Sequence, residues 1–226
     1  LEFRRVLFRS SDKVFDEIYS LNAKYNKEAE ASEEVSRNVH WRLKKLKWDN
    51  LFNYGEGNEI DFTKIKGIMG IFGKNFSGKS SIIDSLLFAI YNNTSKNIRK
   101  NLYVVNQNKK TASCCVEIEV DGKIYKIERN LSRYTKKLKG ETTEEAKATV
   151  DFSCHDALSN ETTNLNGVDG NETNKNIRRV FGTIEDFFAT SMSSQTGALS
   201  FINEGSTRRK EIFAKFLDLE VFETKF

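Results

Sequence analysis

Hydrophobic and polar positions alternate along the chain with two different periods, and each period predicts a type of secondary structure. In residues 12–36, Val14, Ile18 and Leu21 recur at helical spacing, with Glu and Lys on the other faces. This spacing predicts a solvated N-terminal helix, with a partner-binding helix as the alternative. Apolar side chains also cluster at helical spacing in residues 206–226 and predict a second helix there.

The segment that follows the first helix predicts a β-hairpin, then a strand and a helix. Residues 41–48 form a basic, strand-like run, and after a turn-forming stretch residues 59–62 can return as a second strand. Residues 65–72 are mostly apolar and end at Gly73, which predicts a strand buried on both faces. A wide apolar face over residues 79–92 predicts a helix.

The second half of the chain begins with a hairpin signal. Residues 112–120 and 123–130 flank Asp121-Gly122, a dipeptide typical of tight turns between antiparallel strands. Shorter segments complete the prediction: a strand over 147–153, a polar surface loop over 159–176, a helix over 173–181, and a strand or an approach to a helix over 187–194.

One motif carries recognisable chemistry. The run Gly73-Lys74-Asn75-Phe76-Ser77-Gly78-Lys79-Ser80 fits the P-loop pattern G-x-x-x-x-G-K-[ST] in full. A loop ahead of a helix N-terminus offers free backbone N–H groups and the positive end of the helix dipole to a triphosphate. The two glycines let the backbone curl around the phosphates, Lys79 can reach the β- and γ-phosphates, and the Ser80 hydroxyl can bind Mg²⁺. The sequence therefore predicts a nucleotide site.

Composition narrows the class of protein further. The 226 residues include 38% hydrophobic residues and 36 basic against 32 acidic side chains, a net charge of +4 that permits a nucleic-acid partner without proving one. The sequence contains no apolar run of about 18 residues, the length that a membrane helix needs, and no secretory signal is evident. Three cysteines make neither a disulfide framework nor a zinc pattern, so we expect a reducing, cytoplasmic compartment. Residues 1–10 are a candidate assembly or adapter artefact.

Two parts of an ATP-hydrolysing site have no counterpart in the sequence. A Walker-B acid should follow an apolar strand, yet residues 116–121 alternate polar and apolar side chains and run into a turn, so we interpret Asp121 as a turn residue. No Ser-Gly-Gly-Gln-like stretch that could clamp a γ-phosphate is present either. The sequence predicts a nucleotide site without its full hydrolytic machinery.

The chain resembles the N-terminal ATPase lobe of SbcC-type, SMC-like ATPases of DNA double-strand-end processing, including phage recombination endonuclease subunits. The matching blocks, in order, are KLKWDNLFNYGEGNEIDFTKIKGIMGIFGKNFSGKSSIIDSLLFAIY, ASCCVEIEVDGKIYKIERNLSR and NKNIRRVFGTIEDFFATSMSSQTGALSFINEGSTRRKEIFAKFLDLEVFE. The resemblance implies an α/β P-loop NTPase fold: the N-terminal lobe of an ABC-type head with an antiparallel β arm, truncated before a coiled coil. It implies a helical extension at 11–38, the lobe at 39–205 and the start of a coiled-coil helix at 206–226.

The resemblance also implies roles for particular residues. Gln195 would be the Q-loop glutamine, which binds Mg²⁺ together with Ser80 and positions the attacking water. Arg208, Arg209 and Lys210 are candidates for DNA contact, although a charged run is usually a solvated helix face. The implied nucleotide-binding residues are Gly73, Asn75, Phe76, Ser77, Gly78, Lys79, Ser80 and Ser81, with Lys79 and Gln195 as the catalytic pair.

The function implied is the ATP-binding lobe of a DNA repair and recombination ATPase that uses ATP and Mg²⁺. Two heads would dimerise around ATP, each completed by a C-terminal lobe outside this chain. The dimer would gate an SbcD-type nuclease at double-stranded DNA ends. The expected compartment is the cytoplasm, which for a phage protein is that of the host. Some family members carry a basic residue near Leu51 and Phe52, where this chain is apolar. The alternatives are a chromosome-organising SMC or RecF-like ATPase and a DNA-binding module with a vestigial P-loop.

Overall fold

A computed structural model describes residues 12–31, 41–96, 98, 100–138, 141–192 and 205–216. The chain divides into two compact units, Leu1–Asn38 with Phe201–Phe226, and Val39–Ser200. The first unit contains helices α2 (Asp12–Ala31) and α7 (Ser206–Phe216). The second contains the sheet, the loop with the nucleotide motif, and helices α3, α4 and α5.

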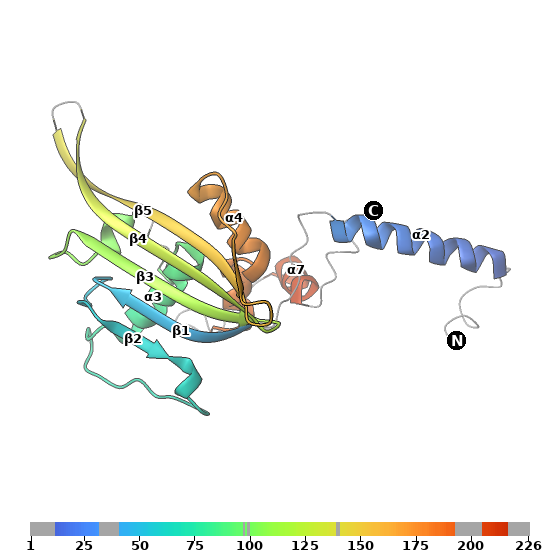
Figure 1. The fold of residues 1–226 in the computed structure, drawn as a ribbon, viewed down its shortest axis with the longest axis horizontal. Helices are drawn as coiled ribbons and strands as arrows, with labels where there is room; N and C mark the ends of the chain where they lie inside the picture. Colours follow the sequence, from blue (N-terminus) through green and yellow to red (C-terminus); the bar gives the residue numbers. More distant parts are fainter. Residues whose placement is uncertain are drawn as a thin grey trace. The chain divides into compact units, whose positions relative to one another are not determined.

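The second unit is built on one six-stranded antiparallel sheet with strand order β2-β1-β3-β4-β5-β6 (Figure 1). The strands β4 and β5 are 16 residues long and extend past the rest of the sheet as a two-stranded arm. The bounds are β1 Trp41–Asp49, β2 Asn58–Asp61, β3 Thr111–Val120, β4 Lys123–Leu138, β5 Glu141–Asp156 and β6 Glu161–Asn164.

Helices cover one face of this sheet. The longest are α3 (Lys79–Tyr91) and α4 (Gly170–Phe181), and α5 (Ile184–Thr190) follows α4. Two short 3-10 turns, η1 (Phe62–Lys64) and η2 (Asn101–Tyr103), lie in the connections. The predicted helices over 79–92 and 173–181 are thereby confirmed.

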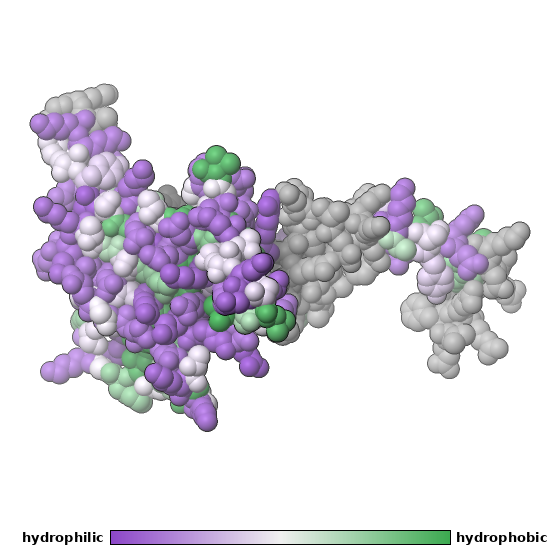
Figure 2. Space-filling model, viewed as in Figure 1, coloured by the Kyte–Doolittle hydropathy of each residue, from purple (hydrophilic) through white to green (hydrophobic). Residues whose placement is uncertain are grey.

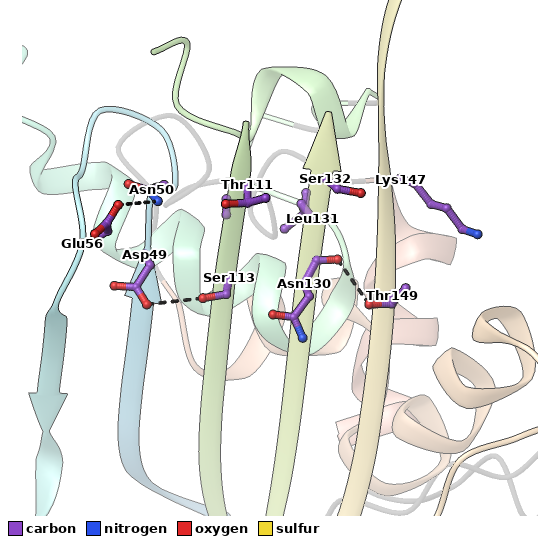
Figure 3. A pocket seen from close by; sticks show the side chains of 11 residues that line it. Asp49, Asn50, Glu56, Thr111, Ser113, Asn130, Leu131, Ser132, Lys147 and Thr149 are labelled. Carbon is purple, nitrogen blue, oxygen red and sulfur yellow. Dashed lines mark hydrogen bonds between the residues drawn. The ribbon is translucent and has the colours of Figure 1, made fainter. Parts of the chain in front are cut away.

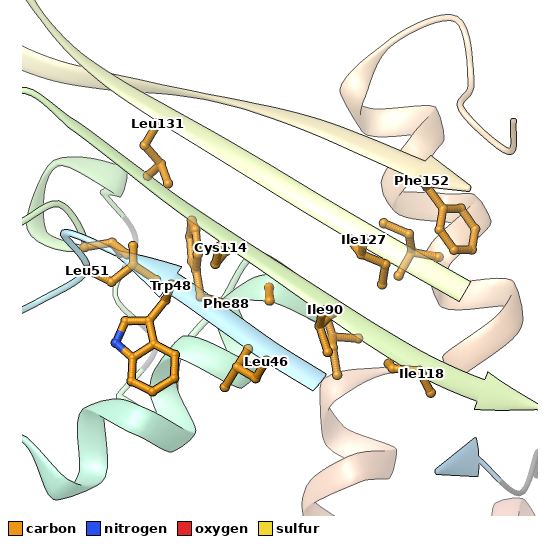
Figure 4. Packing of buried hydrophobic residues seen from close by; sticks show 14 of the residues in the cluster. Leu46, Trp48, Leu51, Phe88, Ile90, Cys114, Ile118, Ile127, Leu131 and Phe152 are labelled. Atoms are coloured by element: carbon orange, nitrogen blue, oxygen red, sulfur yellow. The ribbon is translucent and has the colours of Figure 1, made fainter. Parts of the chain in front are cut away.

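The core lies between the sheet and these helices. Leu46, Val116, Ile127 and Phe152 stand opposite one another on four neighbouring strands, and all four are buried. All four belong to one buried cluster with Phe88 of α3 and Phe181 of α4. Figure 4 shows Leu46 beside α3, while Phe152, whose ring centroid lies 6.3 Å from that of Phe181, sits farther along the sheet. Successive strand residues point to opposite faces of the sheet. Where apolar and polar residues alternate, every second residue, the apolar one, therefore points into this core.

The opposite face of the sheet is polar and is predominantly hydrophilic in Figure 2. Its lysines pair with carboxylates on the same or a neighbouring strand. Lys45 and Lys47 lie 3.1 and 3.3 Å from the Glu59 carboxylate, and Lys126 lies 3.1 Å from Glu128. These exposed pairs neutralise much of the face and contribute little to stability individually.

The predicted β3–β4 hairpin is confirmed. Its turn residues Asp121 and Gly122 have φ angles of 49° and 78°, the left-handed conformation that a tight hairpin turn requires. Asp121 therefore serves the turn, as predicted. Cys114 is buried and Cys115 is half-buried, in keeping with opposite orientations in β3. Burial raises the pKa of the Cys114 thiol to about 12, which makes this cysteine an inert core residue.

Three local predictions are wrong. Residues 65–72 form no strand, and Ile68 and Phe72 are fully exposed, because no described strand pairs with this segment. Residues 187–190 lie in helix α5, which begins with a reciprocal capping box between Thr183 and Asp186, and residues 193–194 lie outside the described part. Residues 159–176 are not one loop, since β6 and the first turns of α4 lie within them.

The first unit is described only through its two helices. Val14, Ile18 and Leu21 lie on α2 with 40%, 49% and 50% of their surface exposed, so the predicted helix forms with a largely solvated apolar stripe. The predicted helix over 206–226 is confirmed for α7, and residues 217–226 lie outside the described part. Among the described residues, no helix is both long and apolar enough to cross a bilayer.

Candidate nucleotide-binding site

The P-loop motif forms an exposed loop that leads directly into α3. Backbone bonds from Ser77 N–H to Lys74 O (3.2 Å) and from Ser81 N–H to Gly78 O (3.0 Å) close its turns. The helix begins at Lys79 without a side-chain cap, because its N-cap residue is Gly78. An uncapped helix N-terminus leaves backbone donors and the positive end of the dipole for an anion.

Of the two motif glycines, Gly78 is required by its backbone conformation, whereas Gly73 lies against the Ser77 side chain. A Cβ on Gly73 would lie 2.8 Å from the Ser77 hydroxyl. Gly78 has a φ of 93°, and a Cβ there would lie 2.7 Å from both polar atoms of the Asn53 amide. Phe76, with a φ of 64°, adopts the left-handed conformation without being glycine. The loop is thus curled so that backbone, rather than side chains, lines its inner side.

Lys79 folds back over this loop. Its ammonium donates to Gly73 O (2.8 Å) and Lys74 O (2.7 Å). These carbonyls hold the cation at the loop itself, where an anion enclosed by the loop would meet it. The residues present therefore fit a phosphate group: backbone donors, a cation and, at Ser80, an exposed hydroxyl one residue further along.

A neighbouring loop supports the P-loop and was not identified from the sequence. The Tyr54 hydroxyl donates to Gly78 O (3.1 Å), and its ring packs edge-on against Trp48 with centroids 5.3 Å apart. Asn106 fixes the same loop by donating to Tyr54 O (2.9 Å). Partial burial raises the pKa of the Tyr54 hydroxyl, which keeps it protonated as a donor. Only the fold brings Tyr54 to Gly78, 24 positions away, so no local pattern could have shown this contact.

The flank of the P-loop is apolar and exposed. Ile68, Phe72 and Phe76 have nearly all of their surface accessible, and Ile83 on the first turns of α3 is 41% exposed. In contrast, Leu87, Phe88, Ala89 and Ile90 in the second half of α3 are buried in the core. The phosphate-binding end of the helix therefore stands beside a hydrophobic surface, which soluble proteins usually cover.

The structure places the other predicted site residues as follows. Asn75 and Ser77 lie in the exposed loop with Phe76, and Ser81 begins α3 together with Ser80. Gln195 lies outside the described residues. Arg208, Arg209 and Lys210 are exposed on α7, in the other compact unit, and Arg208 pairs with Glu211 (2.8 Å). Within the described ranges, no three His, Cys, Asp or Glu side chains gather into a metal site.

A concavity of about 750 Å³ lies beside the end of β1 and is drawn in Figure 3. Its carboxylates already have partners: Asp49 accepts from the Ser113 hydroxyl (3.4 Å), and Glu56 accepts from Lys109 (2.9 Å). It contains none of the P-loop residues. Its lining is Asp49, Asn50, Glu56, Thr111, Ala112, Ser113, Asn130, Leu131, Ser132, Lys147 and Thr149.

Comparison with known families decides what this P-loop domain is. The AAA_23 family, described as an AAA domain, matches residues 45–225. The chain belongs to this family. The match covers the P-loop, α3, α4, α5, α7 and the sheet apart from the first residues of β1. The predicted P-loop NTPase fold class, α/β with an antiparallel β arm, is confirmed.

The relatives of this AAA-domain chain agree with the resemblance. Protein R555 of Acanthamoeba polyphaga mimivirus is 31% identical over 98% of this chain and 15% of its own length. The DNA double-strand break repair Rad50 ATPase of Methanococcus maripaludis is 27% identical over 80% of this chain and 16% of its own. The SbcC component of the nuclease SbcCD of Bacillus subtilis is 26% identical over 76% of this chain and 15% of its own.

These matches place the chain among SbcC/Rad50-like ATPase domains, as the motifs predicted. The chain spans about 15% of the length of these curated relatives. The likeness therefore concerns one part of much longer proteins.

Proposed function

We propose that this chain is the ATP-binding lobe of a DNA double-strand break repair and recombination ATPase. The observation that carries the proposal is the curled, backbone-lined loop between Gly73 and Gly78, placed ahead of the uncapped N-terminus of α3 with the Lys79 ammonium over it. That arrangement suits a triphosphate. The names of the Rad50 and SbcCD relatives supply the DNA-repair part of the proposal.

The residues that would hold the nucleotide are those of the loop and the first turn of α3. Asn75, Phe76 and Gly78 would donate backbone N–H groups to the phosphates, the Ser77 N–H would join them on leaving Lys74 O, and Lys79 would neutralise the phosphate charge. Ser80 and Gln195 would hold Mg²⁺, which would supply charge neutralisation at the phosphates. Ser81 would contribute a further donor to the phosphates.

The exposed apolar flank of the P-loop supports a site divided between two lobes. We infer that a C-terminal lobe of the same ATPase covers Ile68, Phe72 and Phe76 and supplies the acid that activates water. Two such heads would form a homodimer around two ATP molecules. The two heads would close on ATP and open after hydrolysis, and this movement would shift the coiled coils and gate an SbcD-type nuclease. The protein would act in the cytoplasm, which for a phage protein is that of the host.

A paired measurement of binding and turnover tests this division of the site. We expect the 226-residue chain to bind a fluorescent ATP analogue in the presence of Mg²⁺. With ATP as substrate, ADP should form no faster than in a control without protein. Ser80→Ala and Gln195→Ala should chiefly reduce the dependence of binding on Mg²⁺, because each removes one proposed oxygen ligand. Robust ADP release by the chain alone would contradict the divided site.

DNA contact is proposed for α7, where Arg208, Arg209 and Lys210 are all exposed. Phosphate contacts of this kind are independent of sequence and weaken steeply as salt rises. Retention of a double-stranded DNA end should therefore fall between low and physiological salt, and Arg209→Ala with Lys210→Ala should reduce the salt slope by about two. Binding that depends on DNA sequence and resists salt would oppose the proposal.

A further inference from the structure

Arg129 is the basic side chain that is fully buried within the described part of the chain, at 1% exposure. It lies on β4 and points from the sheet toward α3 and α4. No described carboxylate pairs with it. A buried cation without an ion-pair partner is costly, and it persists in a fold only where hydrogen bonds or dipoles compensate for it.

The compensation comes from the end of the P-loop helix. Arg129 Nε donates to Ala89 O (2.8 Å) and Nη2 donates to Ile90 O (2.9 Å), both in the last turn of α3. The last carbonyls of a helix have no partner within it and carry the negative end of its dipole. Burial lowers the pKa of Arg129 to about 10, so the guanidinium is still charged at neutral pH.

A third bond joins this cluster to α4. Arg129 Nη2 also donates to Asn174 Oδ1 (2.8 Å), and Asn174 in turn donates to Gly170 O in the first turn of the same helix (2.7 Å). One guanidinium thus links a central strand, the end of α3 and the beginning of α4. The planar fork of arginine suits three acceptors in fixed directions, which a lysine ammonium matches poorly.

The two ends of α3 differ in how firmly they are packed. The half nearest Arg129 is buried, whereas the first turns beside the P-loop border the exposed apolar flank. The C-terminal end of this 13-residue helix, about 20 Å from the phosphate loop, therefore helps to set its orientation, together with the bond from Tyr54 to Gly78 O at the other end. A small rotation at that end displaces Lys79 and Ser80 at the other.

We propose that Arg129 is a positioning residue for the nucleotide site: it fixes α3 against β4 and α4, and so sets where the P-loop lies. The inference rests on the proposed ATP-binding function and adds a residue outside the P-loop motif to it. Arg129 touches no residue of the loop and acts only through α3.

The test compares Arg129 variants with a core variant that leaves the end of α3 intact. Arg129→Lys keeps the charge but loses the fork, and Arg129→Met removes every donor. Phe152→Leu is the control, since its ring packs against Tyr125 and Phe181 at 5.9 and 6.3 Å. Each variant is measured for unfolding in urea, for Mg²⁺-ATP affinity well below its unfolding transition, and for amide hydrogen exchange along α3.

We expect Arg129→Lys to bind Mg²⁺-ATP about tenfold more weakly than the parent chain, while Phe152→Leu stays within about twofold even where it is equally destabilised. Exchange should rise at the hydrogen-bonded amides of α3, from Ile82 onward, in Arg129→Lys and not in Phe152→Leu. If Arg129→Met does not fold, Arg129→Lys decides the outcome.

Affinity and α3 exchange in Arg129→Lys that match those of Phe152→Leu would overturn the positioning role. Failure of the proposed function would look different, because the parent chain itself would then bind no ATP. In that case exchange along α3 would still decide whether Arg129 holds the helix.

Discussion

The hydroxyl of Tyr54 is the side-chain donor that the first hairpin contributes to the P-loop. It fixes the carbonyl of Gly78, the residue at which the chain turns into α3. Its ring is held separately, by Trp48. The hydroxyl and the ring therefore have separable roles, one at the nucleotide site and one in packing.

Tyr54→Phe should weaken Mg²⁺-ATP binding and lower the free energy of unfolding by no more than the one hydrogen bond that it removes. Loss of one hydrogen bond of about 0.5–1.5 kcal/mol corresponds to roughly two- to tenfold in affinity if the bond serves the loop. Isothermal calorimetry measures the first quantity and urea unfolding the second. Tyr103→Phe, at a residue that is 64% exposed, is the matched control. Equal affinities in both variants would show that the Tyr54 hydroxyl does not support the site.

At the scale of elements, the segment 65–72 separates what the sequence could predict from what it could not. Its apolar composition predicts a strand buried on both faces, but no described strand pairs with it, and most of its side chains are exposed. The β3–β4 hairpin was predictable because its signal, Asp121-Gly122 between alternating residues, is local. The P-loop was predictable for the same reason. Tyr54 and Arg129 were not, because tertiary contacts alone bring them to Gly78 and to the end of α3.

The exposed segment has a measurable consequence. Because uncovered apolar surface drives association, we expect the 226-residue chain to self-associate through this flank. Ile68→Ser combined with Phe72→Ser should lower the apparent mass in light scattering and leave the unfolding midpoint nearly unchanged, since neither side chain is buried. Leu158→Ser, which changes an equally exposed apolar residue on the β5–β6 turn, should have no such effect. An apparent mass that is the same in the parent chain and in all variants would show that the chain does not associate through this flank.

At the scale of the whole molecule, we propose that the lobe is a working half of an ATP site. The sheet and the second half of α3 form a packed core, and this core holds a phosphate loop whose surroundings are partly uncovered. Binding and hydrolysis should therefore separate, because the loop and Lys79 suffice for the first and a second lobe is needed for the second.

Calorimetric titration of Mg²⁺-ATP into the parent chain and into Lys79→Ala tests that claim most directly. We predict saturable binding by the parent and binding roughly 10- to 100-fold weaker in Lys79→Ala, the loss expected for a charged hydrogen-bond donor to phosphate. Circular dichroism on the same samples establishes that both chains are folded. Two results would contradict this division of the site: a folded parent chain that binds no ATP, or a Lys79→Ala variant that binds ATP as tightly as the parent chain.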